Sequence, residues 1–209
     1  QFKDIQKELV PDLDPHLPEL LFTEHHQSHA ASAFFPSPFE KAAILCMDGV
    51  GEWATTSAWI GKNNLIKPLY QISFPHSLGL LYSAFTYYCG FKVNSGEYKL
   101  MGLAPYGIEQ SKETKLFIKK IKSEIVDIKE DGSIFLNQKF FKYTYGLRMI
   151  NENRFKELFG ISTRKHEENI TQTHCNLALA IQKVTEEIFI KMVKETKRIT
   201  KSKNLCLAG

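Results

Sequence analysis

Short apolar runs along the chain predict a set of strands. Residues 42–47 are continuously apolar, which is typical of a strand covered on both faces. Residues 52–60, rich in Thr, Ala and Trp, and residues 65–74 flank the turn residues 61–64 and predict two further strands. The apolar residues 20–22 also suit a short buried strand.

Helical patterns separate and follow these strands. Small and apolar residues at 25–35 predict a tightly packed helix that Pro36 ends. Residues 78–88 predict an aromatic-rich helix closed by Gly90. A shorter helical piece covers residues 96–105.

The longest periodic stretch covers residues 168–200 and is followed by a strand-like run at 205–207. Apolar positions in this stretch recur at intervals of three, four and seven residues, which predicts one amphipathic helix. They are Ile170, Leu177, Ile181, Val184, Ile188, Met192 and Ile199. Strands followed by helices and a further strand predict an α/β domain.

Residues 110–165 differ in character from the rest of the chain. They are rich in Lys, and the turn dipeptide at 131–132, Asp-Gly, separates the apolar runs 125–129 and 133–136. We interpret this region as an insertion that carries a small hairpin. At the start of the chain, three prolines within residues 1–20 predict an extended link.

The composition is that of a globular protein. Of the 209 residues, 43% are hydrophobic and 24% are charged, which excludes a disordered, collagen-like or coiled-coil chain. No apolar stretch approaches 18 residues, so we expect no membrane span. The net charge of +4 is too mild to indicate a nucleic-acid partner, for which a clustered basic stripe would be expected. The chain begins with neither Met nor a signal-peptide layout, and we expect it to be a piece of a longer protein.

The four cysteines are widely scattered, without a Cys-x-x-Cys motif. Such spacing favours neither a disulfide framework nor a thiolate zinc site. Cys46 and Cys206 lie in apolar runs, and we interpret them as small core residues. A reducing, cytoplasmic compartment fits this usage.

The densest group of candidate site residues is a histidine cluster at residues 24–29. His25 and His29 are four residues apart, so on a helix both imidazoles lie on one face and can hold one metal ion. A carboxylate at a nearby strand end would complete a ligand set open to substrate. The alternative is that these histidines are ordinary capping or core residues.

A second candidate site is the segment at residues 48–52, directly after the first predicted strand. Gly49 and Gly51 let backbone N–H groups converge on a phosphate, because no Cβ blocks the approach. Asp48 at the strand tip is placed to bind a divalent cation. The alternative is a plain hairpin with turn-forming Asp and Gly.

A third candidate is the glycine-containing segment at residues 96–107. Its glycines and Pro105 indicate tightly packed backbone, and Met101 and Leu103 are interpreted as packing residues. Lys99 is open to two roles, because an ammonium group can pack on the surface or meet a phosphate or carboxylate as a point charge.

Three sequence blocks appear in an order that is specific when they are taken together. The blocks are His25-His26-Gln27-Ser28-His29-Ala30-Ala31-Ser32-Ala33-Phe34, Asp48-Gly49-Val50-Gly51-Glu52-Trp53-Ala54-Thr55-Thr56 and Lys99-Leu100-Met101-Gly102-Leu103-Ala104-Pro105-Tyr106-Gly107. They resemble the NodU/CmcH carbamoyltransferase family, and residues 205–209 resemble the start of its adenosine-contacting glycine motif. The match covers about residues 20–107, and residues 110–165 add nothing to it.

The resemblance implies an actin-like (ribonuclease-H-like) ATPase fold with a mixed sheet flanked by helices. Residues 1–109 and 166–209 would be parts of this domain, with 110–165 as the insertion. The implied activity transfers a carbamoyl group from carbamoyl phosphate, through a carbamoyl-adenylate made with ATP, to a hydroxyl of a small-molecule acceptor. In the family a C-terminal YrdC-like domain makes the adenylate. We expect that domain and the first strands of the fold to lie in the parent protein outside this chain.

Site roles follow from the matching motifs. The resemblance assigns His25, His29 and Asp48 as ligands of a divalent metal, which would be iron, zinc or magnesium. We expect the cofactor to be bound by Gly49, Val50, Gly51, Lys99 and Gly209. His26 could act as a general base, since its ordinary pKa of about 6.5 suits proton transfer at neutral pH. A role behind the ligands or in packing is the alternative for His26.

Two other functions stay open. The first is a tRNA-modifying threonylcarbamoyl transferase of the same fold, which the Trp-containing block at 48–56, the segment 103–107 and the mild net charge disfavour. The second is a non-catalytic module that kept the fold and lost turnover, which predicts no bound metal. A homodimer is one assembly that the sequence allows.

Overall fold

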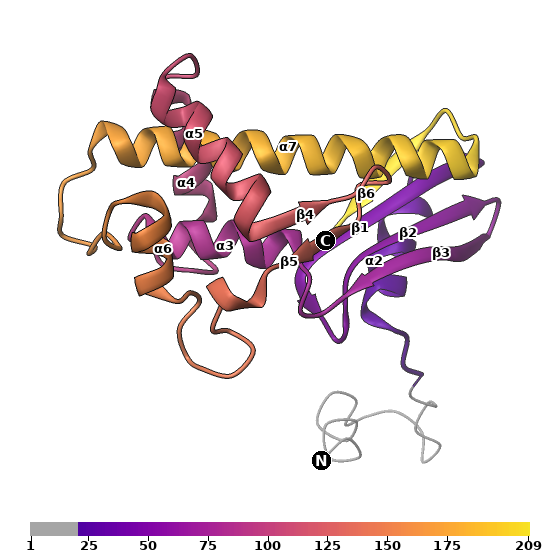
Figure 1. Cartoon of the computed structure of the whole chain (residues 1–209). Helices are drawn as coiled ribbons and strands as arrows, with labels where there is room; N and C mark the ends of the chain where they lie inside the picture. The colour runs from indigo at the N-terminus through magenta and orange to yellow at the C-terminus, as the bar shows by residue number, and fades with distance from the viewer. Residues whose placement is uncertain (1–20) are drawn as a thin grey trace, which may run out of the picture.

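The computed structural model describes residues 21–209, which form an α/β fold with one mixed sheet between helices (Figure 1). The helices are α2 (His25–Phe34), α3 (Leu78–Tyr88), α4 (Glu97–Leu103), α5 (Lys112–Lys120), α6 (Glu152–Phe159) and α7 (Gln172–Thr200). The strands are β1 (Lys41–Gly51), β2 (Ala54–Lys62), β3 (Leu65–Ser73), β4 (Val126–Ile128), β5 (Ile134–Leu136) and β6 (Leu205–Ala208). Short 3-10 helices cover Ala104–Tyr106 and Gln138–Phe140, and a π-helical turn covers Ile121–Ile125. The predicted mixed sheet flanked by helices is confirmed.

The main sheet has the strand order β3-β2-β1-β6. Strand β2 is antiparallel to both β1 and β3, whereas β6 is parallel to β1. Leu45 in β1 therefore lies between Ala58 of β2 and Leu207 of β6. Strands β4 and β5 form a separate two-stranded hairpin.

Strand β1 is covered on both faces, as its continuous apolar run predicts. Ile44 and Cys46 pack on one face with Phe34 of α2. Leu45 packs on the other face, in the core that contains α3 and α7. All three β1 side chains are fully buried, because successive residues of a strand point to opposite faces and both faces are occupied.

Helix α7 spans the length of the molecule and covers one side of both the sheet and the helical part (Figure 1). Its buried stripe includes Leu177, Ile181 and Val184, as the periodicity predicts. The helix begins later than predicted, at Gln172, because Thr171 and His174 form a capping box there. Ile170 therefore lies before the helix and is 45% exposed.

Residues 110–165 share the main hydrophobic core. The Phe155 ring of α6 lies 5.5 Å from the Phe85 ring and 5.0 Å from the Tyr88 ring of α3, measured between centroids. The predicted hairpin is confirmed as β4 and β5. These residues build no core of their own within the described chain, and their interpretation as an insertion stays a prediction.

The strand predicted at residues 20–22 is wrong as far as the structure describes it. Leu21 and Phe22 are in no strand, and their side chains are 80% and 74% exposed. The chain here leads directly into α2. Residue 20 and the three prolines before it lie outside the described residues.

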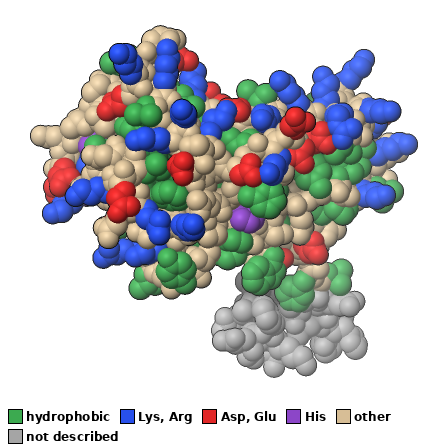
Figure 2. Space-filling view, viewed as in Figure 1, with side chains coloured by type: hydrophobic (Ala, Val, Ile, Leu, Met, Phe, Trp, Pro, Cys, Tyr) green, Lys and Arg blue, Asp and Glu red, His purple; other side chains and the backbone are tan. Residues whose placement is uncertain are grey.

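The surface carries charges of both signs. Figure 2 shows Lys and Arg side chains over much of the visible face, with Asp and Glu side chains between them. Within residues 21–209, no helix has the length and apolar character needed to cross a bilayer.

Candidate functional site

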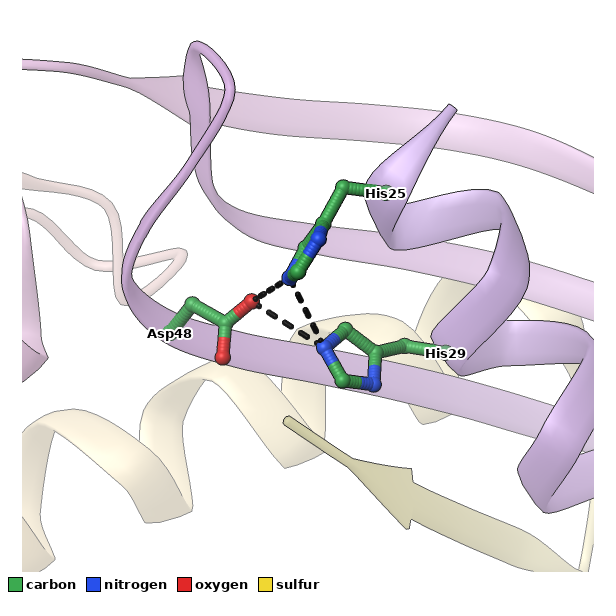
Figure 3. Close-up of side chains that lie close together, drawn as sticks. All are labelled: His25, His29 and Asp48. Carbon is green, nitrogen blue, oxygen red and sulfur yellow. Dashed lines mark hydrogen bonds and ion pairs between the residues drawn. The ribbon is translucent and has the colours of Figure 1, made fainter. Parts of the chain in front are cut away.

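Three of the predicted site residues converge at one end of the sheet (Figure 3). His25 Nε2 lies 2.8 Å from Asp48 Oδ2 and 2.9 Å from His29 Nε2. His29 Nε2 lies 3.3 Å from Asp48 Oδ2. Among the described residues, these three form a group whose ligand atoms all lie within 4.8 Å of one another. The structure thus brings together the predicted metal ligands.

Helix α2 supplies the two imidazoles. His25 and His29 are separated by one turn, so their rings meet on the same face, with centroids 4.5 Å apart. Neither ring is a core residue, since their side chains are 45% and 32% exposed. The helix has no side-chain cap, so neither histidine takes the capping role that the sequence left open.

A bulge in β1 turns the Asp48 carboxylate toward α2. The β1–β2 register is interrupted between Met47, which pairs with Thr56, and Gly51, which pairs with Ala54. Three residues of β1 therefore lie opposite one residue of β2, and a bulge of this kind redirects a side chain. The predicted strand end at Met47 is wrong, because β1 continues through the bulge to Gly51.

Ser77 holds the bulge in place. Its hydroxyl donates to the backbone carbonyls of Asp48 and Gly49, at 3.1 and 2.6 Å, and accepts from the Leu80 backbone N–H. The same serine therefore caps α3 and fixes the backbone at Asp48. Sequence reasoning missed this role, although a serine directly before a helix is the usual N-cap signal.

Gly51 makes room for the histidine cluster. A Cβ at this position would overlap the His25 ring and would lie 3.0 Å from both Asp48 Oδ2 and His26 Cδ2. Its backbone φ is not positive, and neither is that of Gly49. The turn lies instead at residue 52, where φ is +52°. The requirement for glycine at residue 51 thus comes from close approach, and the predicted phosphate cradle stays a prediction.

His26 lies behind the two exposed imidazoles and is 3% exposed. Its Nδ1 lies 2.6 Å from Ser57 Oγ, and its Nε2 lies 3.4 Å from Asp48 Oδ2. Desolvation by burial lowers the pKa of His26, although the Asp48 carboxylate opposes this shift. The general-base role predicted for His26 stays a prediction.

A pocket of about 340 Å³ adjoins Asp48 and is lined by no residue of α2. It lies between the end of β1, the start of α3 and the middle of α7. Tyr82 donates a hydrogen bond to Gln182 Oε1 at 2.8 Å, and burial raises the pKa of Tyr82, so its hydroxyl stays a donor. Gly79 permits the close packing here, since a Cβ would lie 2.8 Å from the Asp48 carbonyl oxygen.

The other predicted cofactor residues do not line this pocket. Gly209 has φ +110°, and a Cβ there would overlap the Met47 backbone, so the chain end lies beside the residue that precedes Asp48. Val50 is 45% exposed at the bulge. Lys99 is exposed on α4, with its ammonium nitrogen 5.9 Å from the Tyr98 ring centroid. The phosphate role of Lys99 stays a prediction.

The cysteines take no part in the cluster. All four are free and buried, and the interpretation of Cys46 and Cys206 as core residues is confirmed. Burial raises the pKa of the Cys46 thiol to about 11, so this residue stays a neutral core side chain beside the site.

Comparison with known proteins agrees with the motifs at this site. Residues 5–209 match the family described as Carbamoyltransferase N-terminus. The chain belongs to the carbamoyltransferase family. The predicted resemblance is therefore confirmed, and the match also includes residues 110–165, which the motif blocks did not reach.

Several relatives of this family member are known. It is 56% identical over 193 residues to the uncharacterized protein sll1178 of Synechocystis, covering 92% of this chain and 30% of that protein. It is 32% identical over 205 residues to nodulation protein NolNO of Sinorhizobium fredii, and the match covers 98% of this chain and 27% of that protein. It is 30% identical over 187 residues to nodulation protein NolO of Bradyrhizobium diazoefficiens, and the match covers 88% of this chain and 30% of that protein. The chain thus spans less than a third of the length of these relatives.

Proposed function

We propose that this chain forms the transfer site of an ATP-dependent O-carbamoyltransferase. The proposed reaction moves a carbamoyl group from a carbamoyl-adenylate to a hydroxyl of a small-molecule acceptor. The observation that carries the proposal is the convergence of His25, His29 and Asp48 beside a pocket, in a chain of the carbamoyltransferase family.

The donor set of the cluster fits a divalent transition-metal ion. Two ligand atoms bound to zinc at about 2.0–2.1 Å in tetrahedral geometry lie about 3.3 Å apart, and the three atoms here are separated by 2.8, 2.9 and 3.3 Å. Imidazole nitrogen suits iron and zinc, whereas magnesium prefers oxygen ligands, so we expect iron or zinc. When bound at His25, His29 and Asp48, such an ion would polarise a carbonyl or hold a phosphate.

The pocket beside Asp48 would receive part of the nucleotide. Its volume of about 340 Å³ is at the small end of ligand sites, so further parts of the parent protein would complete it. Tyr82 and Gln182 supply hydrogen-bonding groups on its wall. Gly209, which ends the chain beside Met47, would continue into the adenosine-contacting motif.

In the proposed step, the acceptor hydroxyl oxygen bonds to the carbamoyl carbon. The bond from that carbon to the phosphate oxygen breaks, AMP leaves with the bonding electrons, and the acceptor proton passes to solvent. Because AMP is a good leaving group, the main task of the protein is to hold the two reactants in line.

The supply of the adenylate falls to the rest of the parent protein. We propose that a YrdC-like domain makes it from ATP and carbamoyl phosphate. The strand order β3-β2-β1-β6, with an antiparallel set joined to a parallel strand, supports the proposal of an actin-like ATPase fold.

The test incubates the purified parent protein with ATP, carbamoyl phosphate labelled in the carbamoyl carbon, and a panel of hydroxyl-bearing small molecules. We expect labelled product and AMP with an accepted substrate, and neither with the Asp48→Asn variant. Asp127→Asn is the matched control, because Asp127 is an exposed acid on the β4–β5 hairpin. Label found in tRNA, or no AMP with any acceptor, would contradict the proposal.

A further inference from the structure

His26 presents a polar atom that needs an explanation. Its Nε2 is buried and has no hydrogen-bond partner among the described residues, yet it faces Asp48 Oδ2 at 3.4 Å. Leaving a buried polar atom unpaired costs free energy, so its protonation state matters to the site. That state follows from the hydrogen bonds made by the other nitrogen of the ring.

Trp59 sets the direction of those hydrogen bonds. An indole N–H can only donate, and Trp59 Nε1 lies 2.7 Å from Ser57 Oγ. The strong acceptor left to this hydroxyl within residues 21–209 is His26 Nδ1 at 2.6 Å, since the neighbouring Cys46 sulfur is only a weak acceptor. Ser57 therefore accepts from Trp59 and has its own proton left to donate to His26.

A donor at Ser57 requires His26 Nδ1 to accept. The neutral ring then carries its proton on Nε2, which faces the Asp48 carboxylate. The opposite tautomer would leave only the weakly accepting Cys46 sulfur for the Ser57 proton. It would also place Nε2 and Asp48 Oδ2, both acceptors, face to face. This assignment of the proton to Nε2 argues against His26 as a further metal ligand, because ligation would need the lone pair of Nε2.

We infer that Trp59, Ser57 and His26 form a hydrogen-bond relay that directs the Nε2–H of His26 at Asp48 and holds this carboxylate in position for the metal. The inference deepens the proposed function and rests on its metal site. It makes His26 a positioning residue, and it favours that role over the general base. Hydrogen-bond partners of metal ligands fix ligand orientation, and their loss typically lowers metal affinity about 10- to 100-fold.

The first test needs no metal. A long-range proton–nitrogen correlation spectrum of the metal-free protein distinguishes a protonated from an unprotonated ring nitrogen, and the spectrum of His26→Gln identifies the His26 signals. We expect a protonated Nε2 and an unprotonated Nδ1. A proton on Nδ1 in the neutral ring would overturn the relay.

The second test measures the affinity of the apo-protein for Zn²⁺ and Fe²⁺ by calorimetry. His26→Leu should weaken binding about 10- to 100-fold, whereas His26→Gln, whose amide N–H can reach Asp48, should recover part of the loss. Ser57→Ala removes the hydroxyl without touching the histidine and should give a smaller loss than His26→Leu.

Cys46→Ala is the matched control for packing. Cys46 is buried and pairs with Ser57 across the β1–β2 ladder. Its Sγ atom lies 3.8 Å from the backbone carbonyl oxygen of His26. We expect this variant to melt at a lower temperature while keeping the wild-type metal affinity.

The outcomes separate the relay from the proposed function. Wild-type affinity in His26→Leu, or a loss in Cys46→Ala as large as in His26→Leu, would overturn the relay while leaving the metal site intact. If the wild-type protein binds neither metal, the metal site of the proposed function fails. In that case the tautomer measurement still decides whether His26 donates to Asp48.

Discussion

The ring of His25 lies in the space that a Cβ at Gly51 would occupy. This contact couples the first turn of α2 to the end of β1, and any larger residue at position 51 requires the ring to move. We predict that Gly51→Ala displaces the His25 ring and lowers metal content at saturating Zn²⁺ by more than half. Elemental analysis after removal of excess metal measures the effect.

Gly102→Ala is the control, because it makes the same glycine-to-alanine change at a position where the added Cβ contacts no other residue. A Cβ at Gly102 has no heavy atom within 4 Å, and the residue lies inside α4. We expect wild-type metal content and a gain of up to about 1 kcal/mol in stability, because alanine favours a helix over glycine. Full metal binding by Gly51→Ala would show that the His25 ring can occupy another position.

Asp48→Asn should remove metal binding with little change in the fold. The substitution keeps the size of the side chain and removes the negative charge that faces three imidazoles. We expect affinity to fall at least about 100-fold, beyond the range typical of groups behind the ligands. Calorimetry measures the affinity, and a thermal melt within a few degrees of the wild type would exclude general unfolding as the cause.

The sequence predicts the elements of this fold better than the details of the site. The apolar run in β1, the stripe of α7 and the aromatic helix α3 were predictable because burial of a strand or helix face leaves a periodic pattern. His25, His29 and Asp48 were predictable as a group because a helical spacing and a strand tip bring few residues into reach.

The parts that were not predictable depend on registry between strands. The bulge before Gly51 follows from two pairings, Met47 with Thr56 and Gly51 with Ala54, and neither pairing can be read from one strand alone. In the sequence, Ser57 and Trp59 have the pattern of ordinary strand residues. Their hydrogen bonds to the site depend on how β2 packs beside β1 and α2. A polar serine at a buried strand position is the one sequence feature that could have drawn attention to the relay.

Phe155→Ala should destabilise the whole described chain. The Phe155 ring is fully buried against Phe85 and Tyr88 of α3, so its loss opens a cavity in the shared core. We expect the free energy of unfolding to fall by about 3–5 kcal/mol, in a single transition. Urea unfolding followed by circular dichroism measures this.

Leu147→Ala is the control within the same region, because the Leu147 side chain is fully exposed. Its effect should stay within about 0.5 kcal/mol. A separate early transition in Phe155→Ala, with the sheet unaffected, would instead show that residues 110–165 unfold as an independent unit.

His174 should make the stability of the chain sensitive to acid. The Thr171 backbone N–H donates to His174 Nδ1 at 3.1 Å, which requires that nitrogen to be unprotonated. Burial lowers the pKa of His174, and Arg164 lowers it further. The unfolded chain, with an ordinary pKa of about 6.5, therefore takes up protons first as the pH falls. The free energy of unfolding should be highest above about pH 6.5 and should decrease as the pH falls through the folded-state pKa.

His174→Gln separates this titration from the cap itself. Glutamine at the third position of a capping box can accept from the Thr171 N–H but does not titrate. We expect the stability of the variant at pH 7.5 to lie within about 1 kcal/mol of the wild type, with a shallower decrease between pH 6.5 and pH 5. Part of the decrease should remain, because burial also lowers the pKa of His26 and His76. Parallel pH profiles of urea unfolding for the two proteins would show that protonation of His174 does not contribute.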